Sequence, residues 1–276
     1  MIPIKYNIGN LTSRRVSTLM TILGIGVVIA VMISMMALQN GVHSAMVSSG
    51  SKDNLMVMRE GAEAEISSWV TKDAYRIIRS MPGIAKDASG APMASPELVI
   101  IFKMPKKDDP KGSNVSVRGV TPEAFTMRPY VKIVEGRMFR PGLGEVIVAR
   151  RIRDRFVNTG LGDTFQFGMQ KYNVVGVFDA QGTAFDSEIW CDVDFLGQAR
   201  KREAYSSLIV RPNDHAAFES IKAAIANDNR LKLAVKSEYQ YYADQTTGLA
   251  GIVVLVAIVT FFMTIGAILG TMNTMF

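Results

Sequence analysis

Two long apolar stretches without a charged residue bracket the polar part of this chain. They cover 16–51 and 245–276, and every Asp and Glu lies between them, in 52–244. LMTILGIGVVIAVMISMMAL and GIVVLVAIVTFFMTIGAIL are each about as long as the roughly 20-residue helix that crosses ~30 Å of hydrocarbon. The pattern predicts transmembrane helices over 16–40 and 248–276, with a water-exposed domain between them.

Positive charges before the first apolar stretch predict its orientation. Lys5, Arg14 and Arg15 precede it without an acidic residue, and positively charged flanks stay in the cytoplasm. We expect Arg14 and Arg15 to anchor the cytoplasmic end and the domain over 41–237 to lie outside the cytoplasm. A cleaved secretory signal is the alternative, but the long apolar core and the poor cleavage site at 44–46 favour an uncleaved anchor.

Residues 1–15 carry an amphipathic pattern of their own. Ile4, Ile8 and Leu11 fall on one face of a helix, beside basic residues that can meet anionic headgroups. We expect a cytoplasmic interfacial helix on the inner leaflet. A frayed terminus is the alternative, because Gly9 weakens a helix by ~1 kcal/mol relative to alanine.

Small side chains recur at helical spacing in both apolar stretches. Gly26, Ala30 and Ser34 form a strip on the first, and Gly266 and Gly270 form a GxxxG pair on the second. Such patterns let another membrane helix approach closely, although they are common in membrane helices. We expect these residues to contribute to helix packing.

The second membrane helix can begin well before the bilayer, because no proline follows Ser237. A helix continuous from Glu238 would be longer than the hydrocarbon core requires, so 238–247 would form a stalk connected to the outer domain. The alternative is a break at 246–248, where Thr-Thr-Gly has weak helix propensity.

The central domain mixes strands with helices. The polar segment PKKDDPKGS predicts a hairpin. Helices are predicted over 71–80, where Thr71 can cap the first turn, and over 149–157 and 214–227. The order predicts an α+β fold with two lobes, one of them a strand-rich insertion at about 121–200. Predicted strands, rich in Val and Ile and bounded by turn residues, include NVSVRGV, VKIVEGRMF, GEVIVA, KYNVVGVF and SSLIVR.

Residues suited to catalysis are scarce. His43 and His215 are far apart, and the chain has neither a GxSxG elbow nor a P-loop. Cys191 is the single cysteine and is more typical of a packed side chain than of a nucleophile. Half of the net charge of +6 comes from the basic residues before the first span, which argues against a nucleic-acid partner. We therefore expect no enzymatic activity and no cofactor.

One acidic run has the composition of a hard-cation site. Asp186, Glu188, Asp192 and Asp194 in FDSEIWCDVD could lie on one side of a strand. Calcium loops normally bring their ligands together with a tight glycine-containing turn, which this run lacks. The simpler interpretation is an exposed acidic face with Ile189 packed inward, so no metal site is expected.

The opening NLTSRRVSTLMTILGIGVVIAV resembles the start of MacB-like permeases of the FtsX superfamily, the membrane subunits of a class of ABC transporters. Further segments look like the recurrent segments of that family's periplasmic core domain, in the same order. They are VRGVTPEAF (117–125), VEGRMF (134–139), GEVIVA (144–149), GLGDTF (160–165), VVGVF (174–178) and FDSEIW (185–190).

The resemblance implies a dimer of permease subunits that works with cytoplasmic ABC ATPase subunits in the bacterial inner membrane. Such proteins use ATP-driven closure on the inside to move their outer domains, and they export peptides or drugs, extract lipoproteins or glycolipids, or regulate cell-wall enzymes. We expect a permease that exports or extracts an amphipathic substrate. The family has four membrane helices, and this sequence ends at Phe276, before the expected C-terminal half.

Two other classes of protein remain as alternatives. A two-helix membrane sensor with an outer ligand-binding domain would have the same topology up to Phe276. An anchored hydrolase is disfavoured, because no nucleophile constellation is present.

Overall fold

The computed structural model describes residues 15–168 and 170–275. The chain divides into two compact units. Within the described residues, a helical unit combines 15–44 with 246–275, and a folded domain comprises Ala45–Gln245.

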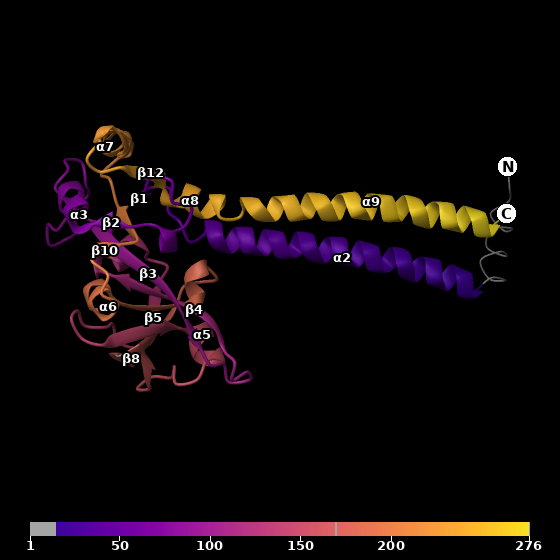
Figure 1. The fold of residues 1–276 in the computed structure, drawn as a ribbon, viewed down its shortest axis with the longest axis horizontal. Coiled ribbons are helices and arrows are strands. Elements are labelled where there is room, and N and C mark those ends of the chain that lie inside the picture. Colours follow the sequence, from indigo (N-terminus) through magenta and orange to yellow (C-terminus); the bar gives the residue numbers. More distant parts are fainter. Residues whose placement is uncertain (1–14, 169, 276) are drawn as a thin grey trace. The chain divides into compact units, whose positions relative to one another are not determined.

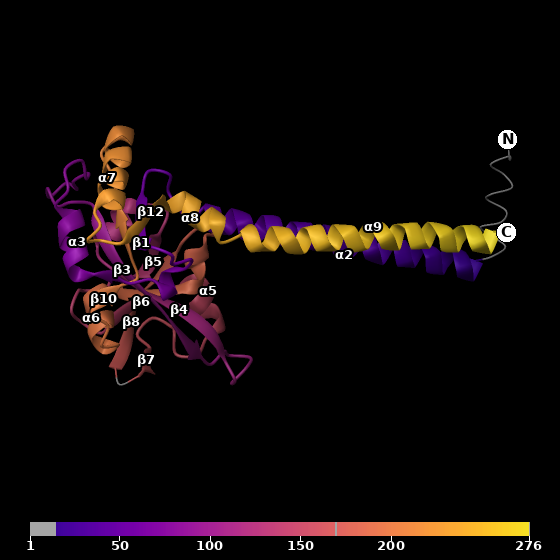
Figure 2. The same cartoon turned by 45° about the horizontal axis from the view of Figure 1, so that its top comes forward.

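Two long apolar helices, α2 (Arg15–Val47) and α9 (Thr247–Met275), form the helical unit. They run alongside each other in both views (Figures 1 and 2). Their large apolar side chains are exposed; Phe262, for example, is 65% exposed. Within the described residues, Thr18–Val47 is long and apolar enough to cross a bilayer, and Val254–Gly266 is a shorter apolar stretch.

Helix α2 is longer than the span predicted over 16–40. It continues to Val47 because no proline or helix-terminating turn intervenes. Its end is marked by side-chain hydrogen bonds, since the Ser48 and Ser49 hydroxyls both donate to the carbonyl of Ala45.

The helix predicted to continue from Glu238 is interrupted. Helix α8 (Glu238–Asp244) ends before a turn at Gln245 and Thr246, and α9 begins at Thr247. The continuous helix is therefore wrong. The alternative of a break beside the threonines is what the structure contains, in agreement with the weak helix propensity of threonine.

One mixed sheet dominates the folded domain. Its long strand β3 pairs by its first part with β11 and by its remainder with β4. Within the described residues, the spatial order is β12 (Leu233–Ser237), β1 (Leu55–Arg59), β11 (Ser207–Val210), β3 (Ala94–Met104), β4 (Ser113–Val120), β9 (Glu188–Asp192), β6 (Glu145–Ala149), β8 (Gln170–Asp179) and β5 (Lys132–Gly136), with β7 (Thr164–Phe167) beside β8.

The sheet has two halves of different origin. Strands β1, β11 and β12 come from both ends of the domain, whereas β5 to β9 come from one continuous stretch, 132–192. The stretch lies inside the insertion expected at about 121–200. Because the halves share β3 and belong to one compact unit, the expected lobes are the two ends of a single sheet.

Helices cover both faces of the sheet. Figures 1 and 2 show α3 (Lys72–Arg79) and α6 (Val193–Ala199) on one side and α5 (Arg150–Arg155) on the other. The central strands are consequently buried on both faces, and every residue of β9 and β11 is buried. The remaining elements are η1 (Glu65–Ser67), β2 (Val70–Thr71), α4 (Glu123–Met127), η2 (Ala184–Ser187), β10 (Ala204–Tyr205) and α7 (His215–Asn227).

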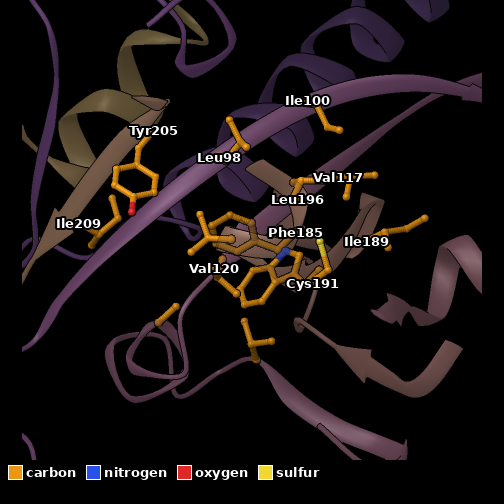
Figure 3. Close-up of a cluster of buried hydrophobic side chains, with 14 of the residues drawn as sticks. Leu98, Ile100, Val117, Val120, Phe185, Ile189, Cys191, Leu196, Tyr205 and Ile209 are labelled. Atoms are coloured by element: carbon orange, nitrogen blue, oxygen red, sulfur yellow. The ribbon is translucent and has the colours of Figure 1, made fainter. Parts of the chain in front are cut away.

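A close-packed apolar cluster fills one side of the sheet. Figure 3 shows Leu98 and Val117 beside Leu196 of α6. Gly119 permits this approach, because a Cβ there would lie 2.7 Å from the Cα of Val193. Helix α6 therefore packs directly on the strand backbone.

The α+β fold class is confirmed, and so are several local predictions. The predicted hairpin joins β3 to β4. The hydroxyl of Thr71 accepts a hydrogen bond from the amide of Ala74 at 3.1 Å and so caps α3. Asp214 caps α7 in the same way, accepting from the amide of Ala217 at 2.8 Å.

Candidate functional site: a buried network of charges

Charged side chains lie together in the interior of the folded domain. Arg118 is 3% exposed and Arg128 is 1% exposed. Fully buried charges are rare in proteins unless they are paired. Four buried glutamates accompany them, namely Glu65, Glu97, Glu188 and Glu238.

Strand register brings three of these charges to one face of the sheet. Arg118 lies opposite Val99 in the antiparallel β3/β4 pair and beside Trp190 in the parallel β4/β9 pair. Paired residues point to the same face, and alternate residues along a strand share it. Glu97 on β3 and Glu188 on β9 therefore face the same way as Arg118.

The guanidinium of Arg118 contacts three carboxylates. It donates to both oxygens of Glu188, at 2.8 and 3.0 Å, and to both oxygens of Glu65, at 2.8 and 2.9 Å. It also donates to Oε2 of Glu97 at 2.7 Å. The indole Nε1 of Trp190 adds a hydrogen bond to Glu188 at 2.8 Å. Bidentate contacts of this kind fix position as well as charge.

Arg128, which follows α4, extends the network to α8. It donates to Glu97 and to Oε1 of Glu238, the first residue of α8, at 2.7 Å. Glu97 is therefore shared by both arginines. The ring of Phe185 lies near both guanidinium groups, 5.2 Å from that of Arg118 and 4.8 Å from that of Arg128.

The second oxygen of Glu238 binds the segment that follows α2. Oε2 accepts hydrogen bonds from Nδ2 of Asn54 at 2.7 Å and from the amide of Ser51 at 3.1 Å. Gly50 lies so close that a Cβ there would be 2.6 Å from the carbonyl oxygen of Glu238. The segments that follow α2 and precede α9 in sequence thus meet, inside the folded domain, at one carboxylate.

Further hydrogen bonds hold the same region. The hydroxyl of Ser49 accepts from the amide of Ala184 at 2.8 Å, and the Tyr130 hydroxyl donates to the carbonyl of Ser49. The amide of Glu65 donates to the hydroxyl of Tyr241 on α8 at 3.2 Å. Helix α8 and the 49–54 segment are therefore tied to both halves of the sheet.

The pKa values of two of the buried glutamates, Glu65 and Glu97, are shifted in opposite directions. Burial raises the pKa of Glu97, even though Arg128 and Arg118 oppose that effect. Burial acts in the same direction on Glu65, but the charge and hydrogen bonds of Arg118 outweigh it, so the pKa of Glu65 is lowered. For Arg118 and Arg128, burial is outweighed by the surrounding glutamates, which raise their pKa values. The arginines therefore stay charged at any physiological pH.

This arrangement is suited to holding the connected segments of the domain in fixed positions. Each of the four carboxylates accepts hydrogen bonds from an arginine, which occupies oxygens that a substrate or metal would need. Across the described residues, no group of three or more His, Cys, Asp and Glu is arranged to hold a metal ion.

The interpretation of FDSEIWCDVD as an exposed acidic face is wrong. Asp186, Glu188 and Asp192 are buried, and only Asp194 is exposed. Asp186 accepts hydrogen bonds from the backbone of the preceding turn, and Asp192 caps α6. Ile189 is buried as expected. The acidic residues serve as local caps and ion-pair partners because the strand is covered on both faces.

The residues expected to pack membrane helices have open surroundings in this chain. Gly26, Ala30 and Ser34 are exposed on α2, and a Cβ added at Gly26 or Gly266 would meet no atom within 4 Å. Gly270 lies one turn further along α9. Their packing role stays a prediction, directed at a second chain or at further helices.

The membrane-anchor residues are only partly described. Arg15 is the first described residue and begins α2. Arg14 and the rest of the interfacial helix expected over 1–15 lie outside the described residues. The anchoring role of Arg14 and Arg15 therefore stays a prediction.

Alternation along β4 hides the network in the sequence. Arg118 alternates with the buried Val115 and Val117, which is typical of an outward-facing residue on a strand with one solvated face. The one available signal was the position of Glu97, Arg118 and Glu188 beside otherwise apolar strand residues. The sequence alone does not show which of these residues contact one another, because that depends on the register of the strands.

Comparisons with known proteins agree with the fold. A family model described as the MacB-like periplasmic core domain matches residues 18–228. The extracellular domain of the noncanonic ABC-type transporter YknZ from Gram-positive bacteria is 14% identical with a TM-score of 0.51, and the match covers 67% of this chain and 100% of that one. The periplasmic region of MacB from Actinobacillus actinomycetemcomitans is 12% identical with a TM-score of 0.53, and the match covers 69% and 91%.

At these identities the two structures support the fold alone. Comparison with curated protein sequences gives no match. The family model, however, spans most of the chain, from the first long helix to the end of α7. This chain therefore belongs to the family of the MacB-like periplasmic core domain.

Proposed function

We propose that this chain is the permease subunit of a MacB/FtsX-type ABC transporter in a bacterial inner membrane. On this proposal α2 and α9 cross the bilayer and the folded domain lies in the periplasm. Two permease subunits work with cytoplasmic ABC ATPase subunits, and ATP hydrolysis moves the periplasmic domain to export or extract an amphipathic substrate. Family membership and two long apolar helices support this proposal.

The observation that carries the proposal is the junction at Glu238. One carboxylate binds Ser51 and Asn54, which follow α2, and also Arg128, which contacts the sheet network through Glu97. The adjoining helix α9 starts only a few residues after α8. A displacement of either membrane helix would therefore act on the same point of the domain.

The network is also stiff enough to transmit such a displacement. Bidentate arginine contacts restrict both distance and orientation, and close-packed interiors move between discrete arrangements rather than deforming smoothly. A shift of Glu238 that keeps its hydrogen bonds would carry Asn54 and Arg128 with it. The domain would then respond as a unit.

The test is purification of the tagged chain, with its natural flanking sequence, from bacterial membranes. We expect an ABC ATPase subunit to copurify. In lipid nanodiscs, Glu238→Gln should change the ATPase rate, because it removes the charge at the junction. The matched control Glu145→Gln, in a partly exposed pair with Arg137, should leave the rate unchanged.

Two results would argue against the permease. Copurification of a kinase or a methyl-accepting protein in place of an ATPase would favour the two-helix sensor. Equal ATPase rates in wild type and Glu238→Gln would remove the junction from the coupling mechanism.

A further inference from the structure

A groove with an uncovered tryptophan lies beside the β12 edge of the sheet. It is lined by residues from the end of β1, the start of α3 and the approach to β12. Its volume is about 680 Å³, within the range of ~300 to 1,000 Å³ that is typical of small-molecule pockets. None of the residues of the buried charge network lines it.

Trp69 is presented to the groove by a stacked arginine. The Arg59 guanidinium lies 4.2 Å from the centroid of the Trp69 ring, and the amide of Arg59 donates to the hydroxyl of Ser68 at 2.9 Å. The stack fixes one face of the indole. Trp69 nevertheless remains 53% exposed, although a large aromatic side chain is normally buried.

Two of the groove's cations have no ion-pair partner among the described residues. They are Arg59, whose buried Nε also lacks a hydrogen-bond partner there, and Lys232. Lys232 adopts a left-handed backbone with φ of 49°, and its carbonyl accepts from the amide of Glu60 at 3.1 Å. The loop that carries this lysine is thereby held against the end of β1.

The remaining charges of the groove largely cancel. Arg230 forms a pair with Asp228 at 2.6 Å, and Asp73 forms a pair with Arg76 at 3.1 Å. Glu60 is the remaining acid that lines the groove. Arg59 and Lys232 outweigh it, so the groove favours a single negative charge.

Apolar side chains complete the groove. Ile77 and Leu231 are half-buried, and Ala74 and Leu233 are buried. They lie near the open indole of Trp69, which offers further apolar area. Cationic and apolar side chains that line one groove match a ligand that has an anionic head and a hydrocarbon body.

We propose that this groove binds a small amphipathic anion. Its carboxylate or phosphate lies beside Arg59 and Lys232, and its hydrocarbon part lies against Trp69 and Leu231. This inference deepens the proposed function and rests on it in one respect, that the bound anion represents the transported material. Binding itself requires no ATPase, so the groove can be tested separately.

The two tryptophans make the groove directly observable. Trp190 is fully buried, so a change in emission on adding a ligand reports on Trp69. The full chain in liposomes is titrated with hexyl phosphate, hexanoate and the uncharged hexanol. We expect a saturable change with at least one of the two anions and none with hexanol. Tighter binding of hexyl phosphate would indicate a phospholipid-like ligand, and tighter binding of hexanoate a fatty-acid-like one.

Matched variants separate binding in the groove from partitioning into lipid. Arg59→Gln and Lys232→Gln should each weaken the apparent Kd at least about tenfold, because each removes a charge-assisted hydrogen bond. Lys222→Gln, which changes a lysine outside the groove, should leave Kd unchanged. Trp69→Phe should abolish the signal, and unchanged Trp190 emission in that variant shows that the domain is folded.

The groove proposal is overturned if no anion gives a saturable change, if hexanol binds as tightly, or if Arg59→Gln and Lys232→Gln bind like wild type. Binding that is confirmed but leaves the ATPase rate of the assembled transporter unchanged would overturn only the link to transport. Failure of the groove and failure of the transporter assignment therefore give different results.

Discussion

Each buried arginine of the network holds parts of the chain that are far apart in sequence. Arg118 joins η1, β3 and β9, and Arg128 joins β3 to α8. Removing charges from water costs several kcal/mol per ion, so a buried ion pair adds little net stability compared with a well-packed apolar pair. What the network supplies is a defined geometry. Once these charges are buried, loss of one partner lowers the stability of the domain strongly, because the remaining charge is left unpaired.

Loss of one arginine should destabilise the domain strongly. Arg118→Met leaves the buried Glu65 and Glu188 without an arginine and removes one of the two arginines that contact Glu97. We expect the free energy of unfolding to fall by about 3 to 5 kcal/mol. Urea unfolding followed by Trp190 emission measures this change. Arg137→Met, at the partly exposed pair with Glu145, should cost less than about 1 kcal/mol. Equal losses in the free energy of unfolding would show that breaking the buried network is no more destabilising than breaking the partly exposed ion pair.

The opposite pKa shifts of Glu65 and Glu97 predict opposite pH dependences. The pKa of Glu65 is lowered from 4.5, so its contribution to stability is present above that pH and is lost as the pH falls. The pKa of Glu97 is raised from 4.5, so its contribution is complete below that pH and is lost as the pH rises through the raised value.

Urea unfolding between about pH 3 and pH 7 checks both signs. Glu65→Gln should flatten the fall in stability on the acid side. Glu97→Gln should remove a component that decreases with rising pH. An acid limb that is as steep in Glu65→Gln as in wild type would show that Glu65 is not held ionised by Arg118.

Secondary-structure elements could be predicted where the pattern is local. The β3/β4 hairpin has a polar turn between two Val- and Ile-rich runs, and α3 and α7 begin at side chains that cap them. Local patterns cannot show that β9 is buried on both faces. The exposed acidic face that its sequence predicts is wrong for that reason. The same limit conceals the network, because Arg128 and Glu238, far apart in sequence, are brought together only by tertiary packing.

The junction of α8 with the segment after α2 requires glycine at position 50, because there is no room for a side chain. At Gly50 an added Cβ would lie 2.6 Å from the Glu238 carbonyl oxygen, which is too close for any carbon atom. Gly50→Ala should push α8 away from the segment and cost about 1 to 3 kcal/mol. The control Gly248→Ala meets no atom within 4 Å and lies in a helix, so it should be neutral or slightly stabilising.

Urea unfolding and the ATPase rate of the assembled transporter give two readouts for these glycine substitutions. Gly50→Ala should lower the free energy of unfolding and alter the ATPase rate. A Gly50→Ala protein that is as stable and as active as wild type would mean that α8 can move away from Ser51 and Asn54 without consequence.

Over the described residues, a domain that contains a paired network of buried charges is joined to two helices whose large apolar side chains are exposed. Leu19, Ile22 and Phe262 are among many large apolar side chains exposed on α2 and α9. Exposed apolar surface of this extent requires lipid or other helices around it. This combination agrees with the transporter proposal, in which movement of the membrane helices displaces a domain that keeps its internal geometry.

Cysteine labelling can establish on which side of the membrane the domain lies. Cys191 is the only cysteine of the chain and is buried, and burial raises the pKa of its thiol, so it should not react with maleimides. Lys222→Cys, on α7, places a single reactive thiol at a residue whose side chain is 45% exposed. Lys5→Cys places one before the first apolar stretch.

Labelling of these two variants in intact spheroplasts, with a maleimide that cannot cross membranes, is the decisive measurement. We expect Lys222→Cys to be labelled at once, and Lys5→Cys only after the membrane is permeabilised. Labelling of Lys5→Cys alone in intact spheroplasts, or of both variants only after permeabilisation, would show that the domain does not lie outside the cytoplasm and would refute the proposed permease.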